Sequence, residues 1–457
     1  MIDSSAQVRA DHGEAEPVAR YVAGVLGLDT TGTPEAAIQL LLDGDRDLGD
    51  EGYELVARAD RVSIRAHRQA GLFWGVQTLR QLLPASGGLP AEVPEVRIRD
   101  VPRFAWRGLM LDVARHFFGV EDVKRVIDLA ALYKINVLHL HLTDDQGWRI
   151  AVESWPDLAV VGGRTAVGGG PGGYYTQADY AEIVNYAASR FITVVPEIDV
   201  PGHTNAALVA YPELTCDGRA PSVATGTAVG FSSLCPEKPI TQRFIEDVFG
   251  ELAGLTPGPY LHLGGDEAWS TPPGQYAQFI ERVQRVIRAA GKRPVGWQEI
   301  VSAELVPSAV VQYWNTNAGP AQAEAAVRNG ARLIVSPADR VYLDMKYDPS
   351  TGLGLDWAGH VEVEDSYGWD PAEISSEIGE PDVDGVEAAL WTETVITLGE
   401  IESMVLPRLP AVAEVAWSRR DARDWAGFRV RLAPHALRWD AAGTAYHRSP
   451  AIPWPAS

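Results

Sequence analysis

The sequence predicts an α/β protein in which a (β/α)8 TIM barrel follows a small α+β domain. Beyond residue 100, eight short apolar runs recur along the chain, and stretches with helical periodicity lie between most of them. Eight buried strands with crossover helices in roughly 320 residues are typical of this barrel. Before residue 100 the pattern instead predicts a hairpin and one helix. We therefore expect a non-catalytic domain of residues 1–100 and a barrel domain of residues 101–457.

The first domain is predicted from two local patterns. Residues 1–20 show no clear periodicity, and we expect an irregular lead-in there. Apolar residues then alternate over Tyr53–Ala57 and Val62–Ala66, with a polar break between them, which is typical of a β-hairpin. An amphipathic helix packed on one side of these strands is expected next, because apolar residues recur at helical spacing at Leu72, Val76, Leu79 and Leu83.

The barrel strands are predicted from apolar runs bounded by turn signals. They are Gly108–Val113, Val137–Leu142, Ile192–Ile198, Tyr260–Leu263, Pro294–Trp297, Val310–Trp314, Leu333–Val335 and Val386–Leu390. The clearest helices between them are Val120–Tyr133, Tyr180–Arg190, Ile240–Leu252, Tyr276–Ala290 and Ala321–Asn329. The stretch Asp339–Gly385 shows no helical pattern, and we expect a long loop, which in a compact domain is often functional.

Charge and composition exclude several classes of protein. The 457 residues include 39 Lys and Arg against 61 Asp and Glu, so the net charge is −22. We therefore expect no binding to nucleic acid or to an anionic membrane, because both require a basic face. The polar, acidic start lacks the features of a secretory signal, so we expect a cytoplasmic location for the chain as given, or secretion if an upstream signal is missing. Cys216 and Cys235 fall in one loop-like stretch and could form a disulfide or remain free thiols.

Polar and aromatic residues follow nearly every predicted strand, at the end of the barrel where active sites lie. Carboxylates suit sugar hydroxyls, and indole faces suit the C–H surface of a sugar ring. Adjacent carboxyls after two glycines, as in Asp266 and Glu267, suit acid/base chemistry when one of them keeps its proton. The residues at or after these strand ends include Arg115, Asp144, His203, Asp266, Glu267, Trp297, Trp314, Tyr342, Asp344, Trp357, Trp391 and Glu393.

Three interpretations of these residues compete: a glycosidase, a metal-dependent barrel hydrolase, and a protein that binds sugar without cleaving it. The metal site would use His139 and His141, helped by His203, His262 and Asp266. A bare His-x-His is a weak signal, and both histidines precede the end of their strand. The adjacent carboxyls of Asp266 and Glu267 argue against a protein that only binds.

Several blocks of the chain agree in order and spacing with one known family: Arg107–Phe118, His139–Arg149, Pro196–His203 and Trp391–Glu393. Together with Leu261–Glu267, they resemble family 20 of the glycoside hydrolases, the β-N-acetylhexosaminidases of bacterial type. In that family Leu261–Glu267 would be the catalytic segment. Residues 71–79 resemble part of the family's non-catalytic α+β domain.

The resemblance implies an exo-acting, retaining enzyme that removes terminal GlcNAc or GalNAc from β-linked glycans such as chitooligosaccharides, with no cofactor and no metal. The 2-acetamido oxygen of the substrate attacks the anomeric carbon and forms an oxazolinium ion, so the enzyme needs no nucleophile of its own. Glu267 would act as general acid and then base, Asp266 would orient the acetamide, and Tyr342 would hold its oxygen. Asp144 and His203 would tune the protonation of Glu267.

The resemblance also assigns the residues that bind the terminal sugar. Arg115 and Glu393 would grip its hydroxyls with Asp344 nearby, and Trp357 would stack on the next sugar. The acetamido methyl would be enclosed by Trp297, Trp314 and Trp391. A disaccharide-releasing relative of the same family remains an alternative, and so does the metal-dependent hydrolase built on His139 and His141.

Overall fold

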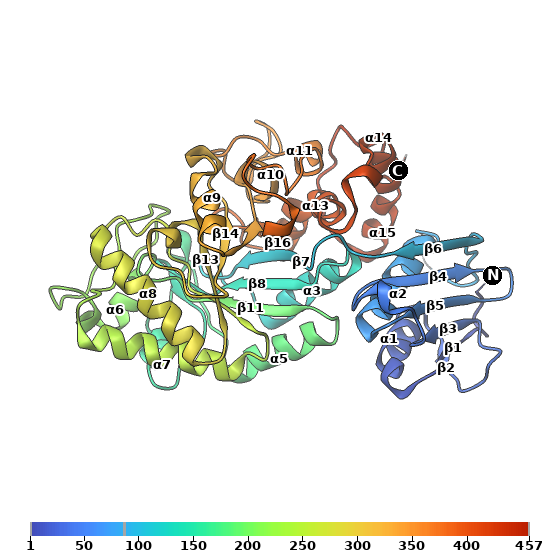
Figure 1. The fold of residues 1–457 in the computed structure, drawn as a ribbon, viewed down its shortest axis with the longest axis horizontal. Coiled ribbons are helices and arrows are strands. Elements are labelled where there is room, and N and C mark those ends of the chain that lie inside the picture. Colours follow the sequence, from blue (N-terminus) through green and yellow to red (C-terminus); the bar gives the residue numbers. More distant parts are fainter. Residues whose placement is uncertain (1, 86–87, 456–457) are drawn as a thin grey trace. The chain divides into compact units, whose positions relative to one another are not determined.

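The computed structural model describes residues 2–85 and 88–455 (Figure 1). The chain divides into two compact units. The first contains the residues up to Arg103, the short segment Ala131–Lys134 and the residues from Ala416 onward. The second contains Phe104–Ala130 and Ile135–Val415. No helix in the described ranges is both long enough and apolar enough to cross a membrane.

The first unit is built on a six-stranded mixed sheet with the order β2-β1-β3-β5-β4-β6. The predicted hairpin is confirmed as the antiparallel pair β4 and β5, whose alternate residues are buried. The predicted helix is α2 (Gln69–Leu82), and its Gly75 lies so close to Ile64 that a Cβ there would be 2.4 Å from that side chain. The strands are β1 (Gln7–Ala10), β2 (Asp29–Thr30), β3 (Ile38–Leu41), β4 (Tyr53–Ala57), β5 (Val62–Ala66) and β6 (Val96–Asp100).

The expected irregular lead-in over residues 1–20 is wrong. Strand β1 and the start of helix α1 (Glu16–Leu26) lie in this region. The strand is only four residues long, and Val8 is its one fully buried side chain, so alternation could not be recognised. Pro17 stands in the first turn of α1, where its missing N–H costs nothing, and Gly27 ends the helix in the left-handed conformation.

The predicted division into residues 1–100 and 101–457 stays a prediction. The C-terminal helices α14 (Trp425–Leu432) and α15 (His435–Ala442) lie in the first compact unit. Arg438 of α15 donates hydrogen bonds to the main-chain carbonyls of Arg80 and Gln81, in the last turn of α2, and of Leu83, just past its end. These carbonyls lack helical partners, and the guanidinium supplies them with donors.

The second unit is a closed parallel barrel with the strand order β7-β8-β11-β12-β13-β14-β15-β16, which confirms all eight predicted strands. Each strand is buried on both faces by the barrel interior and the outer helices, and it therefore appears in the sequence as a continuous apolar run. The strands are β7 (Trp106–Asp112), β8 (Val137–His141), β11 (Thr193–Glu197), β12 (Tyr260–His262), β13 (Arg293–Trp297), β14 (Val310–Tyr313), β15 (Arg332–Val335) and β16 (Val383–Leu390).

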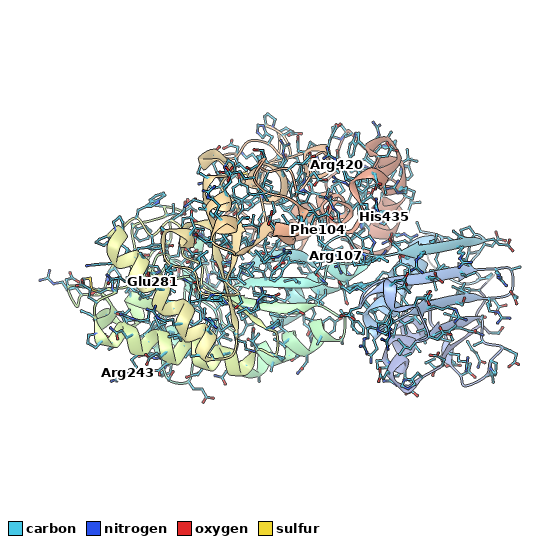
Figure 2. All side chains as sticks on the ribbon, in the orientation of Figure 1. Phe104, Arg107, Arg243, Glu281, Arg420 and His435 are labelled. Atoms are coloured by element: carbon cyan, nitrogen blue, oxygen red, sulfur yellow. A yellow bond between two sulfur atoms is a disulfide. The ribbon has the colours of Figure 1, made fainter. Side chains whose placement is uncertain are left out.

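The five predicted helices are confirmed as the outer helices α3 (Val120–Leu132), α5 (Gln177–Ala188), α7 (Pro239–Leu255), α8 (Pro273–Ala289) and α9 (Ala321–Arg328). Figure 2 shows Arg243 projecting from the outer side of α7. The remaining helices of this unit are α4 (Asp157–Val160), α6 (Asn205–Ala210), α10 (Ala338–Val341), α11 (Val363–Tyr367), α12 (Leu398–Val405) and α13 (Arg408–Trp417), and a short hairpin joins β9 (Thr143–Asp144) to β10 (Gly147–Trp148).

The expectation of a helix-free loop over Asp339–Gly385 is wrong in detail. The short helices α10 and α11 interrupt it, and both are too short to show helical periodicity. Arg408 is fully buried under this segment and donates hydrogen bonds to the carbonyls of Leu343, Met345 and Val361. A side chain of α13 thereby holds the segment in place by satisfying its main chain.

The barrel interior is layered. A lower layer is apolar and consists of Trp106, Val137, Val195, Val295, Val310 and Ile334. The layer above it is polar and consists of His139, Glu197, His262, Gln312 and Glu387, all fully buried. Above these, toward the carboxyl ends of the strands, aromatic side chains pack beside the functional site.

Candidate active site

A pocket of about 340 Å³ opens at the carboxyl ends of the barrel strands. Nine of the twelve residues predicted for the site line it: Arg115, Asp266, Glu267, Trp314, Tyr342, Asp344, Trp357, Trp391 and Glu393. Five lining residues were not predicted: Thr227, Val229, Asn315, Asn317 and Leu355. The other three predicted residues, Asp144, His203 and Trp297, are buried and do not line the pocket.

The turn after β12 places Asp266 and Glu267 at the pocket. Gly264 and Gly265 both have positive φ, at 67° and 98°. A Cβ on Gly264 would lie 1.8 Å from the Asp199 carboxylate, so this position has no room for any side chain. The main-chain N–H of Gly265 donates to Asp199 at 2.9 Å, which fixes the turn on the neighbouring strand end. The two glycines are therefore required by the geometry that presents the carboxyl pair.

Two non-glycine residues at the pocket have a strained backbone. Glu267 and His203 both have positive φ, at 45° and 53°, a conformation that costs a non-glycine residue roughly 1 to 2 kcal/mol. Their side chains face each other, with His203 Nε2 3.5 Å from the Glu267 carboxylate. Such strain persists only where the surrounding structure enforces it, and it clusters at active sites.

A buried chain of charged groups lies behind Glu267. His203 Nδ1 contacts Asp144 at 3.3 Å, and Asp144 also accepts from Arg115 Nη2 at 2.8 Å. Burial raises the pKa of Asp144, but Arg115 and His203 outweigh this effect and hold the pKa well below its ordinary value. Burial lowers the pKa of His203, but Asp144 and Asp266 outweigh it and hold the pKa well above its ordinary value. His203 is therefore a cation beside the two carboxyls of the pocket.

The carboxyl of Asp266 is shifted toward neutral pH. Burial, reinforced by the nearby Glu267, raises the pKa of Asp266 from 3.8 to about 6, although the charge of His203 acts in the opposite direction. Behind it, burial and the charge of Asp266 raise the pKa of Asp199 well above its ordinary value. At neutral pH Asp266 is thus mostly an anion, and Asp199 behind it binds a proton more tightly than an ordinary aspartate.

Aromatic side chains form one wall of the pocket. The rings of Trp314 and Tyr342 stack with centroids 6.2 Å apart, and Trp357 stands edge-on to both at 5.8 and 5.9 Å. Trp391 completes the wall, and the guanidinium carbon of Arg115 lies 4.8 Å from the centroid of its ring. Trp297 lies behind Trp391 at 5.8 Å and is only 1% exposed, so it supports the wall from below.

Several buried polar atoms at the pocket have no hydrogen-bond partner among the described residues. They are Arg115 Nε, Asp266 Oδ1, both carboxylate oxygens of Asp344, and Glu393 Oε2. Burial and the charge of Glu393 raise the pKa of Asp344 well above its ordinary value. Buried polar atoms are nearly always paired in native proteins, so this cluster indicates a ligand rich in hydroxyl and amide groups.

His139 and His141, the proposed metal ligands, lie in the barrel interior and do not line the pocket. His139 contacts Glu387 at 2.8 Å and Glu197 at 3.0 Å, and His141 contacts Glu197 at 2.5 Å and Asp144 at 3.0 Å. Glu197 also accepts from the indole N–H of Trp297 at 2.8 Å. These contacts form an unbroken series of histidines and carboxylates from Glu387 to Asp144, which in turn pairs with the lining residue Arg115.

Thr227 and Val229 were missed because they come from a loop with no periodic pattern. Cys216 and Cys235 form a disulfide that closes this loop, which we call the disulfide loop (residues 216–235). The hydroxyl of Ser232 donates to Asp145 at 2.5 Å, and Gln146 donates to the carbonyl of Gly226 at 2.7 Å. The hairpin that carries Asp144 thus also holds the disulfide loop against the pocket.

Comparison with known proteins decides the family. The model of the glycosyl hydrolase family 20 catalytic domain matches residues 104–277 and 272–420, and the model of domain 2 of that family matches residues 1–101. The chain belongs to glycosyl hydrolase family 20. It is therefore a glycoside hydrolase, and the alternative of a metal-dependent barrel hydrolase built on His139 and His141 is not supported.

The relatives within family 20 are similar over nearly the whole chain. A β-N-acetylhexosaminidase from Cellulomonas fimi is 52% identical, with 93% of this chain and 86% of that protein aligned. The structure of the family 20 β-N-acetylhexosaminidase from Streptomyces coelicolor A3(2) is 53% identical, with a TM-score of 0.97 over 99% of this chain and 95% of that one. A Streptomyces plicatus β-hexosaminidase variant in complex with GlcNAc has the same identity and TM-score, over 99% and 94% of the two chains.

Proposed function

We propose that this protein is an exo-acting, retaining β-N-acetylhexosaminidase that removes terminal GlcNAc or GalNAc from β-linked glycans, chitooligosaccharides among them. The observation that carries the proposal is the pocket itself. It combines the Asp266–Glu267 pair, an aromatic wall and unpartnered polar atoms in a volume suited to one amino sugar. The bound GlcNAc in the S. plicatus relative supports the same ligand class.

Glu267 is the proton carrier of the proposed mechanism. Its side chain is 22% exposed at the pocket, so the carboxyl can reach the oxygen of the departing sugar. Glu267 protonates this oxygen as the glycosidic bond breaks, and its carboxylate then removes a proton from the incoming water. The cationic His203 at 3.5 Å stabilises the carboxylate between these steps, and Asp144 holds His203 in its charged state.

Asp266 and Tyr342 position the acetamido group of the substrate. The Asp266 anion accepts the acetamide N–H and leaves the acetamido oxygen free to attack the anomeric carbon. Its negative charge also stabilises the positive charge that develops on the oxazolinium ring. Tyr342 donates its hydroxyl proton to the acetamido oxygen, while Trp314 and Trp391 enclose the methyl group with Trp297 behind them.

Arg115, Asp344 and Glu393 bind the hydroxyls of the terminal ring. Their unpartnered atoms offer both donors and acceptors, and hydrogen bonds to charged groups are worth about 1.5 to 3 kcal/mol each. Because burial and the charge of Glu393 raise the pKa of Asp344, its carboxyl binds a proton more readily than an ordinary aspartate, and in the protonated form it also donates to a sugar oxygen. Trp357 is 43% exposed at the pocket and stacks on the sugar next to the cleaved bond.

A panel of nitrophenyl glycosides tests the proposal. We expect release of nitrophenol from the β-N-acetylglucosaminide and β-N-acetylgalactosaminide and none from the plain β-glucoside. Thiazoline analogues of the cyclised sugar should inhibit strongly, since they resemble the intermediate. Hydrolysis of the plain glucoside alone would refute the acetamido mechanism. Release of intact disaccharides from a chain would instead favour the disaccharide-releasing alternative.

A further inference from the structure

Trp269 is the most exposed large apolar side chain in the described ranges, at 71%. It stands two residues after Glu267, on the segment that carries the proton donor. A single exposed apolar residue is unremarkable on a protein surface. Trp269 differs from such residues because its ring is held on Gly230 and lies beside the pocket.

The indole of Trp269 is held in a fixed place on the disulfide loop. It lies directly over Gly230, where a Cβ would be 2.2 Å from a ring carbon. The main-chain N–H of Trp269 donates to the carbonyl of Glu267 at 2.7 Å, and the hydroxyl of Ser270 donates to the carbonyl of Gly230 at 2.7 Å. One side of the ring is therefore packed against main chain while most of its surface faces solvent.

The ring also lies beside the pocket. Gly230 directly follows Val229, and Val229 lines the pocket together with Glu267. Trp269 itself does not line the pocket, whereas Trp357 does. Trp269 therefore lies next to a lining residue, outside the lining itself.

The path of the glycan out of the pocket suggests a role for Trp269. Glu267 must reach the oxygen of the leaving sugar, so the part of the glycan beyond the cleaved bond emerges past the segment of Glu267. We propose that Trp269 is a second aromatic platform, on which a sugar beyond the one at Trp357 stacks when the substrate is a β-linked oligosaccharide. This inference rests on the proposed function and adds to it a preference for substrates of three or more sugars.

The expected gain follows from the chemistry of the contact. An indole face and the C–H surface of a pyranose both carry apolar area that is exposed before binding. Because the ring is already anchored on Gly230, stacking costs little side-chain ordering. By analogy with aromatic pairs, one such platform changes kcat/KM by roughly 3- to 10-fold.

Chain-length dependence tests the inference. Trp269→Ala should lower kcat/KM for the chitin trimer and tetramer by roughly 3- to 10-fold, mainly through KM, while the nitrophenyl sugar and the dimer are unaffected. Trp269→Phe should restore most of the loss, because it keeps an aromatic face. Phe231→Ala is the matched control, since Phe231 is 48% exposed on the same loop but lines a separate cavity of about 520 Å³.

The outcomes separate this inference from the proposed function. If the wild-type protein does not cleave the nitrophenyl sugar, the proposed function fails. If it does, and Trp269→Ala affects all chain lengths equally or none, the platform is refuted on its own. A change in sedimentation behaviour without any chain-length effect would assign Trp269 to self-association and would likewise overturn the inference.

Discussion

The charge state of Asp266 should set the acidic limit of activity. Because the mechanism requires the anion and the pKa of Asp266 is about 6, kcat/KM should rise through pH 6. About one tenth of the molecules carry the anion at pH 5 and about nine tenths at pH 7, so the rate at pH 5 should be roughly a tenth of that at pH 7. Initial rates on the nitrophenyl β-N-acetylglucosaminide between pH 4 and 8, below saturation, measure this limb directly.

Two variants separate Asp266 from its neighbour. Asp266→Asn should lower the rate by about 10² to 10³ and remove the acidic limb, because the amide does not titrate. Asp199→Asn should keep a limb near pH 6, because Asp266 still titrates and the amide oxygen can still accept from Gly265. A limb that survives Asp266→Asn, or a flat wild-type profile from pH 5 to 7, would refute the assignment.

Three further predictions concern the surroundings of the pocket. Asp144→Asn should destabilise the fold by about 3 kcal/mol in denaturant titrations, because it removes the 2.8 Å ion pair of the buried Arg115 and leaves the longer one with Asp112, at 3.4 Å. Burial and the charge of Asp266 raise the pKa of Glu299 to about 8, so its carboxyl is protonated in the folded protein at neutral pH. The free energy of unfolding of the wild type therefore falls as pH rises from about 5 to 8, because the unfolded chain loses this proton first. The melting temperature of Glu299→Gln should exceed that of wild type by an amount that grows over this pH range. Replacing Cys216 and Cys235 by Ser should lower the free energy of unfolding by about 3 kcal/mol. It should also raise KM, because the disulfide loop forms part of the pocket wall. An unchanged KM would show that the loop keeps its position without the bond.

The barrel could be predicted from the sequence because each strand is buried on both faces. Val310–Tyr313, for example, is completely buried, and a run of this kind needs no tertiary information to be recognised. Strand β1 could not be recognised in this way, since its side chains are mostly only partly buried. Helices α10 and α11 are no longer than five residues, which is too short for periodicity to appear.

Some residues of the site could likewise be predicted from their position in the chain, whereas others are placed only by contacts between distant segments. Asp266 and Glu267 follow a strand end directly, so their position was predictable from chain order and from the barrel rule. Trp297 also stands at a strand end, but its indole turns inward to Glu197, which chain order does not reveal. Thr227 and Val229 reach the pocket only through contacts of the disulfide loop with a distant hairpin.

The polar layer of the barrel interior connects the middle of the domain to the chemistry at its rim. From Glu387 through His139, Glu197 and His141 to Asp144, each group contacts the next within 3.0 Å, with hardly any solvent to screen their charges. A proton gained or lost at one of them changes the electrostatic potential at the others. Attempts to stabilise this barrel by filling its interior with aliphatic side chains would therefore also retune the proton affinities on which cleavage of the sugar depends.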